Sequence, residues 1–583
     1  MGKKKEIPAA TEKKLKQHFE TIYGNGKVDE CIGKTMGLIR KYGLTPGKKI
    51  DFRDIWTHRD QILITYGDMV QPQQHESVSK LYKQNHFLRR KLKGLITTVH
   101  VLPFFPSTSD DGFSVVDYKR VDSRLGGWED IEELSGDFRV MADLVMNHVS
   151  RYSSWFQAYL RNEEPYTDYF IEVDPDTDLS QVTRPRSSPL LTPVHTNEGE
   201  KFVWCTFSDD QVDVNFANPD VLFEYIDNFL FYLSKGISVV RLDAVAFIWK
   251  QPGTNCIHLK ETHEIVKLFR TISDCYAPEA TIITETNVPH KENISYFGDG
   301  DETHMVYQFS LPPLLLHALL TGNAKYLSDW ASSLNHLPEN CTYFNFTSSH
   351  DGIGVRPLEG LVPQNEFDAL VSGIRKKGGF VSEKQNPDGT LSPYELNITY
   401  FDAFSGENGS QALQEKRFLC SQIIAMSLQG VPGIYFHNLT ATRNNLRGVS
   451  LTGRYRTINR KKWYYEELME ELSDPDTSAS RIFTRMKDLI SKRWHHPAFH
   501  PFGDQKVYRI DDDLFCIERS DPDNTERVLV IANVTSKEKS VELKGNGLPL
   551  KENKSYSDIL SGKEVITENH LDIDSYTVVW IKI

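Results

Sequence analysis

The stretch VMADLVMNH at residues 140–148 joins a strand-like apolar run to a polar Asn-His pair. Seven other short runs rich in β-branched or aromatic residues recur along the chain, at 62–66, 95–102, 239–242, 281–284, 305–309, 343–346 and 433–435. Amphipathic segments of helical periodicity, such as 219–234 and 261–273, lie between them. Strands that alternate with helices are typical of a parallel sheet with crossover helices. Eight repeats predict an α/β fold of the closed (β/α)8 TIM barrel type rather than an open sheet.

Segments outside these repeats predict additional domains. Residues 1–50 carry apolar side chains at helical spacing and predict an N-terminal helical extension to a main barrel domain at 51–490. Two connections are unusually long, which is common for functional loops: a loop-rich inserted domain at 149–212, after the third strand, and a second excursion at 352–411. Short alternating runs from about residue 501 onward predict a C-terminal antiparallel β domain, placed at 491–583.

Composition excludes several classes of function. The chain has 583 residues, of which 39% are hydrophobic and 25% charged, as in ordinary globular proteins. Its net charge of −13 and its lack of a long basic run argue against nucleic acid as a partner. The seven scattered cysteines never form a CxxC pair, which favours reduced thiols over a disulfide framework or a zinc site. The sequence shows no membrane span and no apolar signal core near residue 1, so we expect a cytoplasmic protein.

Polar residues follow several of the predicted strands at their carboxyl ends. The strands end in Asp143 and His148, in Arg241 and Asp243, in Glu285, and in His350 and Asp351. This end of a TIM barrel carries the catalytic residues, because the barrel interior is packed. Three carboxylates brought together there fit glycoside transfer, in which one attacks the sugar and another protonates the leaving oxygen. Any one of them alone is more often structural, so the prediction rests on the set.

The same stretches resemble a known family. DLVMNH (143–148), VVRLDAV (239–245), ITETN (283–287) and SSHD (348–351) resemble the four conserved segments of the alpha-amylase superfamily, glycoside hydrolase family 13. RPR (184–186), LPPLLLHALLTG (311–322), HDGIGV (350–355) and INR (458–460) are similar to the sucrose phosphorylase subfamily. Within that group, ETNVPHKENISYFGDGDE (285–302) and SPYELNITYFDA (392–403) look most like glucosylglycerate phosphorylases.

The resemblance implies roles for individual residues. Asp243 would be the nucleophile, Glu285 the general acid and base, and Asp351 the third carboxylate that grips the sugar. Arg241 would orient Asp243, and the pair Asp68 and Arg460 would close the far end of the glucose site. The resemblance places His100, His148, Gln211 and His350 around the glucose, and Arg186 and Tyr394 around the phosphate. No metal or organic cofactor is implied.

The acceptor is indicated by two features of the second excursion. Ser392 stands where sucrose phosphorylases typically have an acidic residue that holds fructose. The basic run 375–377 would attract an anionic acceptor such as glycerate, although such a run can also simply face water. The resemblance thus implies reversible phosphorolysis of 2-O-α-D-glucosyl-D-glycerate to α-D-glucose 1-phosphate and D-glycerate, by a retaining double displacement.

Several alternatives stay open from the sequence. A phosphorylase of sucrose, sucrose 6'-phosphate or glucosylglycerol would keep the chemistry and change the leaving group. A hydrolase or transglucosylase of family 13 would use the same carboxylates without phosphate. A non-catalytic member of the superfamily is disfavoured, because all three carboxylates are present. In each catalytic case the partners are small-molecule substrates, and a homo-oligomer is possible.

Overall fold

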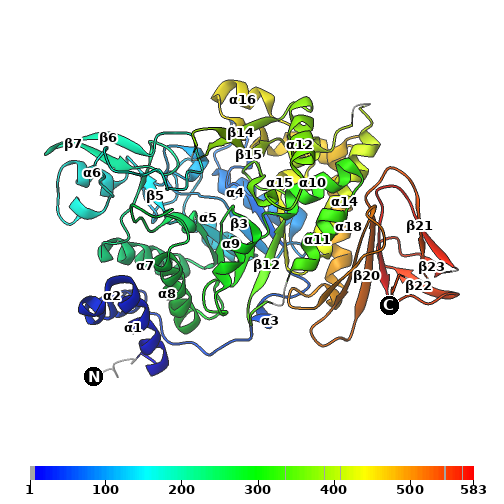
Figure 1. Cartoon of the computed structure of the whole chain (residues 1–583), viewed down its shortest axis with the longest axis horizontal. Helices are drawn as coiled ribbons and strands as arrows, with labels where there is room; N and C mark the ends of the chain where they lie inside the picture. The colour runs from blue at the N-terminus through cyan, green and yellow to red at the C-terminus, as the bar shows by residue number, and fades with distance from the viewer. Residues whose placement is uncertain (1–6, 335–336, 387, 407–408, 544–545, 568) are drawn as a thin grey trace.

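The structure is a computed structural model of the whole chain, and it describes residues 7–334, 337–386, 388–406, 409–543, 546–567 and 569–583. Eight parallel strands close into a barrel in the order β1-β16-β12-β11-β10-β9-β4-β3 (Figure 1). They are β1 (Ile62–Thr65), β3 (Thr98–Val101), β4 (Arg139–Val145), β9 (Ile237–Asp243), β10 (Thr281–Thr284), β11 (Met305–Tyr307), β12 (Thr342–Phe346) and β16 (Val431–Tyr435). Each of the eight predicted runs overlaps one of these strands, so the predicted barrel is confirmed.

Helices between the strands cover the outside of the barrel. They include α4 (Lys80–Leu92), α5 (Trp128–Ser135), α7 (Pro219–Ser234), α8 (Lys260–Tyr276), α10 (Leu311–Thr321), α14 (Gln411–Ser427) and α18 (Ser478–Trp494). The start of α7 shows how sequence sets a boundary. Asn218 caps the helix by accepting a hydrogen bond from the Asp220 backbone N–H, and Pro219 occupies the first helical position, where no N–H is needed.

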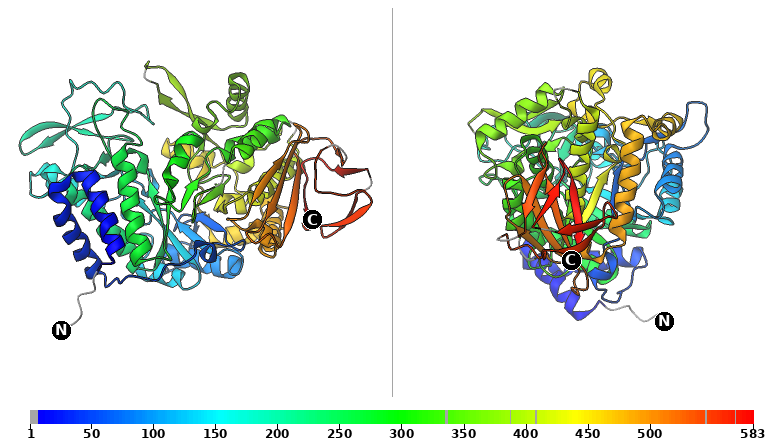
Figure 2. Two further views of the ribbon diagram at one scale, coloured as in Figure 1. Left: turned by 60° about the horizontal axis from the view of Figure 1, so that its bottom comes forward. Right: turned by 90° about the vertical axis from the view of Figure 1, so that its right-hand side faces the viewer.

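The N-terminal extension forms two helices, α1 (Ala9–Tyr23) and α2 (Val28–Lys41), which lie against α8 and α7 (Figures 1 and 2). Leu15 and Phe19 of α1 are fully buried there. The buried His18 ring lies 2.6 Å from the Glu264 carboxylate and 2.9 Å from the Thr271 hydroxyl, both on α8. The extension is therefore fixed to the outside of the barrel.

The two long connections leave the barrel at the carboxyl ends of β4 and β12, which is the same rim because the strands are parallel. The first holds β5 (His148–Ser150) and β8 (Gln211–Asp213), which pair with each other, and the hairpin of β6 (Leu191–Thr196) and β7 (Gly199–Trp204). The second holds α12 (Gln364–Lys376) and a three-stranded sheet of β13 (Ile353–Gly354), β15 (Leu391–Asn397) and β14 (Phe380–Gln385). In Figure 1 these segments gather along one edge of the molecule.

The C-terminal part is an antiparallel sheet with the strand order β18-β19-β20-β25-β22-β23, at the opposite end of the molecule from α1 (Figure 2). Its strands are β18 (Gln505–Tyr508), β19 (Leu514–Ser520), β20 (Arg527–Asn533), β22 (Lys554–Asp558), β23 (Glu564–Thr567) and β25 (Val578–Lys582). The start expected at 491 falls inside α18, which continues to Trp494. The indole N–H of Trp580 donates to the Ser427 hydroxyl at 2.8 Å and so links the sheet to α14. Within the described residues, the structure contains no helix with the length and apolar character needed to span a membrane.

Candidate active site

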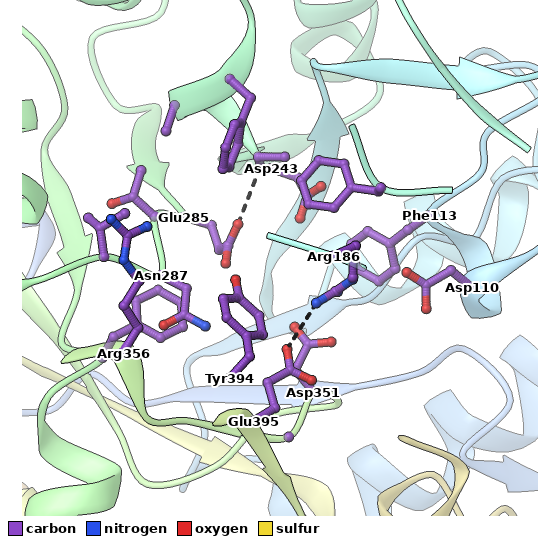
Figure 3. Close-up of a pocket in the computed structure, with 18 of the residues that line it drawn as sticks. Asp110, Phe113, Arg186, Asp243, Glu285, Asn287, Asp351, Arg356, Tyr394 and Glu395 are labelled. Carbon is purple, nitrogen blue, oxygen red and sulfur yellow. Dashed lines mark hydrogen bonds and ion pairs between the residues drawn. The ribbon is translucent and has the colours of Figure 1, made fainter. Parts of the chain in front are cut away.

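A cavity of about 770 Å³ opens at the carboxyl end of the barrel (Figure 3). The residues expected from the sequence that line it are Asp243, Glu285, Asp351, His148, Gln211, His350, Arg186 and Tyr394. The cavity therefore brings together side chains from β9, from the loops after β4, β10 and β12, and from both long connections.

Arg241 organises the floor of the cavity. Its Nη1 lies 2.6 Å from Asp243 Oδ1 and 2.5 Å from Asp143 Oδ1, and its Nη2 lies 3.9 Å from Glu285 Oε2. Asp143 is held from its other side by His100, whose Nε2 lies 2.7 Å from Asp143 Oδ2. His100 thus acts on the guanidinium through Asp143. It is not among the described residues that line the cavity. These partners fix the guanidinium, and through it the Asp243 carboxyl, in one orientation.

The backbone after β9 aims a hydrogen-bond donor at Glu285. Ala244 has a left-handed conformation with φ of 51°, which is costly for a residue with a side chain. In this conformation its N–H donates to Glu285 Oε2 at 3.3 Å (Figure 3). The strained turn therefore keeps the Glu285 carboxyl beside the end of β9, where Asp243 lies.

Burial sets the protonation of Asp243 and Glu285. Burial raises the pKa of both carboxyls, and their mutual repulsion raises that of Asp243 further. Because a charged Glu285 makes the ionisation of Asp243 more costly, the two carboxyls titrate as a coupled pair. Asp243 has the closer contact with the Arg241 cation, 2.6 Å against 3.9 Å, and this contact favours its ionised form. The geometry therefore favours Asp243 as the ionised partner and Glu285 as the protonated one, which are the states that a nucleophile and a general acid require.

Asp351 is ionised for a different reason. Burial alone would raise the pKa of Asp351, but three neighbouring cationic or polar groups, Arg456, His350 and Arg460, bring it well below the ordinary value. Arg456 Nη1 lies 2.6 Å from Asp351 Oδ1, and Arg460 Nη2 lies 3.4 Å from the same oxygen. The sequence did not single out Arg456, which lines the cavity.

The structure corrects the expected pair of Asp68 and Arg460. Asp68 Oδ1 lies 2.6 Å from Lys462 Nζ, and Asp68 is not among the described residues that line the cavity. Arg460 Nη1 instead lies 2.5 Å from Asp111 and 3.5 Å from Asp110. Both aspartates have a left-handed backbone with φ of 49°, which bends the loop after β3 toward the cavity so that Asp110 lines it. The motif SDDG at 109–112 is the sequence feature that indicates this turn, since adjacent aspartates and a glycine after a strand favour left-handed backbone conformations.

Aromatic rings form the sides of the cavity. Phe113 stacks on His350 with ring centroids 4.8 Å apart and an angle of 4°. Phe207 contacts the His148 ring at 5.2 Å and lines the cavity as a sugar platform would. Phe104, Phe105 and Phe216 are buried in the core.

Three arginines among the described residues line the cavity, and two of them, Arg186 and Arg456, lie beside Glu395. Arg186 lies over the Tyr394 ring at 5.3 Å, and its Nη1 is 3.9 Å from Glu395 Oε1 (Figure 3). Arg456 binds the same carboxylate with two nitrogens, at 2.5 and 3.1 Å. Arg356 completes the set of cations that line the cavity. Glu395 and Arg356 were also missed from the sequence, because their neighbours come from segments far away in the chain.

The expected role of the basic run at 375–377 is wrong. Arg375 and Lys376 are exposed at the end of α12, and the Lys377 ammonium donates to the Ser405 carbonyl. None of the three is among the described residues that line the cavity. Ser392 does not line it either, and its hydroxyl donates to Asn386 at 3.0 Å. The positive charge at the cavity wall comes instead from Arg186, Arg356 and Arg456.

A buried ion pair joins the inserted segment to the loop after β9. Lys250 Nζ lies 2.8 Å from Asp213 Oδ2 and 2.7 Å from Asn147 Oδ1, and it also donates to the Phe247 carbonyl. The Lys250 and Asp213 side chains are 2% and 0% exposed. Asp213 ends β8, the strand that begins with Gln211. The pair therefore holds one wall of the cavity against the loop that follows Asp243.

Comparison with known proteins places the chain in a family. Residues 91–354 match the alpha amylase catalytic domain, and residues 506–582 match the cyclo-malto-dextrinase C-terminal domain. A glucosylglycerate phosphorylase of Spirochaeta thermophila is 48% identical, with 82% of this chain and 81% of the relative covered. One from Escherichia coli is 44% identical, with 90% and 92% covered.

The fold also matches solved structures. A sucrose 6F-phosphate phosphorylase from Thermoanaerobacter thermosaccharolyticum superposes with a TM-score of 0.71 at 24% identity, with 84% of this chain and 97% of that chain covered. This likeness shows a shared barrel fold. Together with the identities above, it leads to one conclusion: the chain belongs to glycoside hydrolase family 13, the alpha-amylase family, and within it to the sucrose phosphorylase subfamily that includes the glucosylglycerate phosphorylases.

Proposed function

We propose that this protein is a retaining phosphorylase that converts 2-O-α-D-glucosyl-D-glycerate and phosphate reversibly into α-D-glucose 1-phosphate and D-glycerate. The observation that carries the proposal is the placement of Arg186, Arg356 and Arg456 on the acceptor side of a cavity that also holds Asp243 and Glu285. Guanidinium groups suit phosphate and carboxylate, because their planar fork can bind two oxygens together. Relatives that are 44–48% identical are named glucosylglycerate phosphorylases, which supports the same substrate here.

The first half of the reaction transfers glucose to the enzyme. The ionised Asp243 attacks the anomeric carbon, and the bond from that carbon to the glycerate oxygen breaks. Glu285 gives its proton to the departing oxygen, so D-glycerate leaves and a covalent glucosyl ester forms on Asp243. Asp351 accepts hydrogen bonds from the sugar hydroxyls, since Arg456 and Arg460 keep it ionised.

The second half returns the glucose to phosphate. A phosphate oxygen attacks the anomeric carbon from the side that glycerate left, Glu285 takes the proton of that oxygen, and the ester bond to Asp243 breaks. Two inversions give net retention, so the product is the α-anomer. The arginines of the acceptor side hold the phosphate in place during this step, which favours phosphate over water as the acceptor.

The proposed reaction bears on the partners and the location of the protein. All substrates of this reaction are small molecules. We extend the proposal to a cytoplasmic location, which is supported by seven cysteines that all stay free in the structure. A homo-oligomeric state stays a prediction, to be measured by sedimentation.

The proposal is tested with purified protein and α-D-glucose 1-phosphate. Phosphate release is followed with D-glycerate, fructose, fructose 6-phosphate, glycerol or water as the acceptor. We expect release chiefly with D-glycerate. Faster release with fructose, fructose 6-phosphate or glycerol would identify that compound as the acceptor in place of glycerate, and the protein would still be a phosphorylase. Release with water alone would make the protein a hydrolase.

A further inference from the structure

A second cavity, of about 930 Å³, lies directly outside the active site. Arg356 and Tyr394 line both cavities, so the two are neighbours across these side chains. One wall of the outer cavity is the loop 179–185 of the inserted segment, and the other is the hairpin of β14 and β15. Both long connections therefore contribute to it, as they do to the acceptor side of the active site.

The outer cavity has an unusual charge for this protein. The described residues that line it include Arg184, Arg356 and Lys384 and no Asp or Glu, although the chain as a whole carries a net charge of −13. The Arg184 guanidinium donates to the Ser188 carbonyl, which is neutral, and so its charge is not compensated by that contact. A concave surface lined by one sign of charge attracts ions of the other sign.

Two of these cations have acidic partners on their outer side. Lys384 Nζ lies 3.1 Å from Glu359 Oε1, and Arg356 Nη2 lies 3.7 Å from Glu292 Oε2. The Glu359 and Glu292 side chains are 53% and 43% exposed and do not line the cavity, whereas the two cations are only 20% and 18% exposed. Water screens the exposed carboxylates more strongly than the half-buried cations. The field inside the cavity is therefore positive.

The side chains that line the active site include more acidic than cationic groups. Among the described residues, five carboxyl groups line it, against three arginines. Under the proposed function, phosphate, glucose 1-phosphate, glycerate and glucosylglycerate are all anions, and each would approach a site rich in acids. We propose that the outer cavity is an anion vestibule, a binding site for a phosphate or carboxylate group that collects anionic reactants and passes them to the acceptor side. The identity of these anions rests on the proposed function, whereas the charge of the cavity does not.

The test removes two charges from the vestibule and two from a matched position. The double variant Arg184→Gln/Lys384→Gln loses the cations that line the outer cavity only. The control Arg375→Gln/Lys376→Gln lies on the exposed end of α12 and lines neither cavity. Each double variant also loses one surface ion pair, Lys384 with Glu359 or Arg375 with Glu383, so the two are matched in that respect.

The first readout is kcat/KM for phosphate and for glycerate, at increasing ionic strength. Because electrostatic steering typically raises association by about 10- to 1,000-fold, we expect the vestibule variant to lose about 10-fold in kcat/KM for both anions at low salt, and to show a flatter salt dependence. The control keeps the wild-type values. Equal kcat/KM and equal salt dependence in both double variants would overturn the vestibule. A loss of kcat/KM for phosphate alone would show that the vestibule binds phosphate, and a loss of kcat/KM for glycerate alone would show that it binds the carboxylate.

The second readout separates this inference from the proposed function. Calorimetric titration with inorganic phosphate measures Kd without turnover, so it does not depend on which acceptor the enzyme uses. We expect Kd to rise several-fold in the vestibule variant and to stay unchanged in the control. If the wild type proves inactive with glycerate, the proposed function fails. The Kd for phosphate still tests whether the vestibule binds anions, and equal Kd values in the two variants would refute it.

Discussion

Replacing Lys250 with methionine tests how the inserted segment is held to the barrel. Removing one partner of a buried ion pair typically costs about 3–5 kcal/mol, because the other charge stays buried without compensation. Asp213 would keep the hydrogen bonds from the Thr206 N–H and hydroxyl, at 2.9 and 2.5 Å, so the expected loss for Lys250→Met is at the lower end, about 3 kcal/mol. Since β8 would lose its anchor, KM for glucose 1-phosphate should rise as Gln211 shifts.

The double variant Lys250→Met/Asp213→Asn provides the control. It removes both charges and keeps the volume, and replacing a buried pair with neutral groups is often close to neutral in stability. Thermal unfolding and initial rates of all three variants measure the effect. We expect the double variant to recover at least half of the lost stability. A single variant as stable as the wild type, or a double variant less stable than Lys250→Met, would show that the pair does not clamp this wall.

Three further predictions concern the catalytic groups. Asp243→Ala should lower turnover by at least about 10⁴-fold with an unchanged circular dichroism spectrum, since no other carboxyl can form the glucosyl ester. The pKa of Glu285 is raised, so its acid form is present below that pKa and is lost as pH rises through it; kcat/KM for phosphorolysis should therefore fall on the alkaline side, and Glu285→Gln should remove this limb of the profile. Asp110→Asn should raise KM for glucose 1-phosphate by about 10- to 100-fold, the usual effect of losing a hydrogen bond to a charged group, whereas Asp68→Asn should change it less than about threefold; equal effects would contradict the placement of Asp110, rather than Asp68, on the cavity wall.

The barrel could be predicted because its strands are short apolar runs separated by helical segments, and several of these runs end in polar residues. Asp243 and Glu285 could be predicted for the same reason, since a strand end fixes where a side chain points in this fold. The surface position of Arg375 was also within reach of the sequence. Leu370, Val371 and Ile374 have the spacing of a buried helix face, which places Lys376 on the opposite face and Arg375 at the edge, in the last turn of the helix.

The contacts on the acceptor side could not be predicted in this way. Arg460 meets Asp111 across 349 positions of sequence, and Arg456 meets Glu395 across 61. Such contacts depend on how several long loops pack together, and no local pattern records that packing. The incorrect choice of Asp68 has the same origin, because an acid just after β1 looks as suitable as one after β3 until the loops are placed.

One short helix joins the two halves of the site. Arg456 lies in η7 (Tyr455–Asn459) and Arg460 directly follows it, and both contact Asp351, while Arg456 also holds Glu395. An anion that binds Arg456 would therefore act on the same guanidinium that positions Asp351, the carboxylate that we propose holds the glucosyl group. Water brings no charge to this guanidinium and gains nothing from it. Because Arg456 belongs to the glucose side and to the acceptor side at once, the geometry gives a physical reason why the glucosyl ester should await an anionic acceptor rather than hydrolyse.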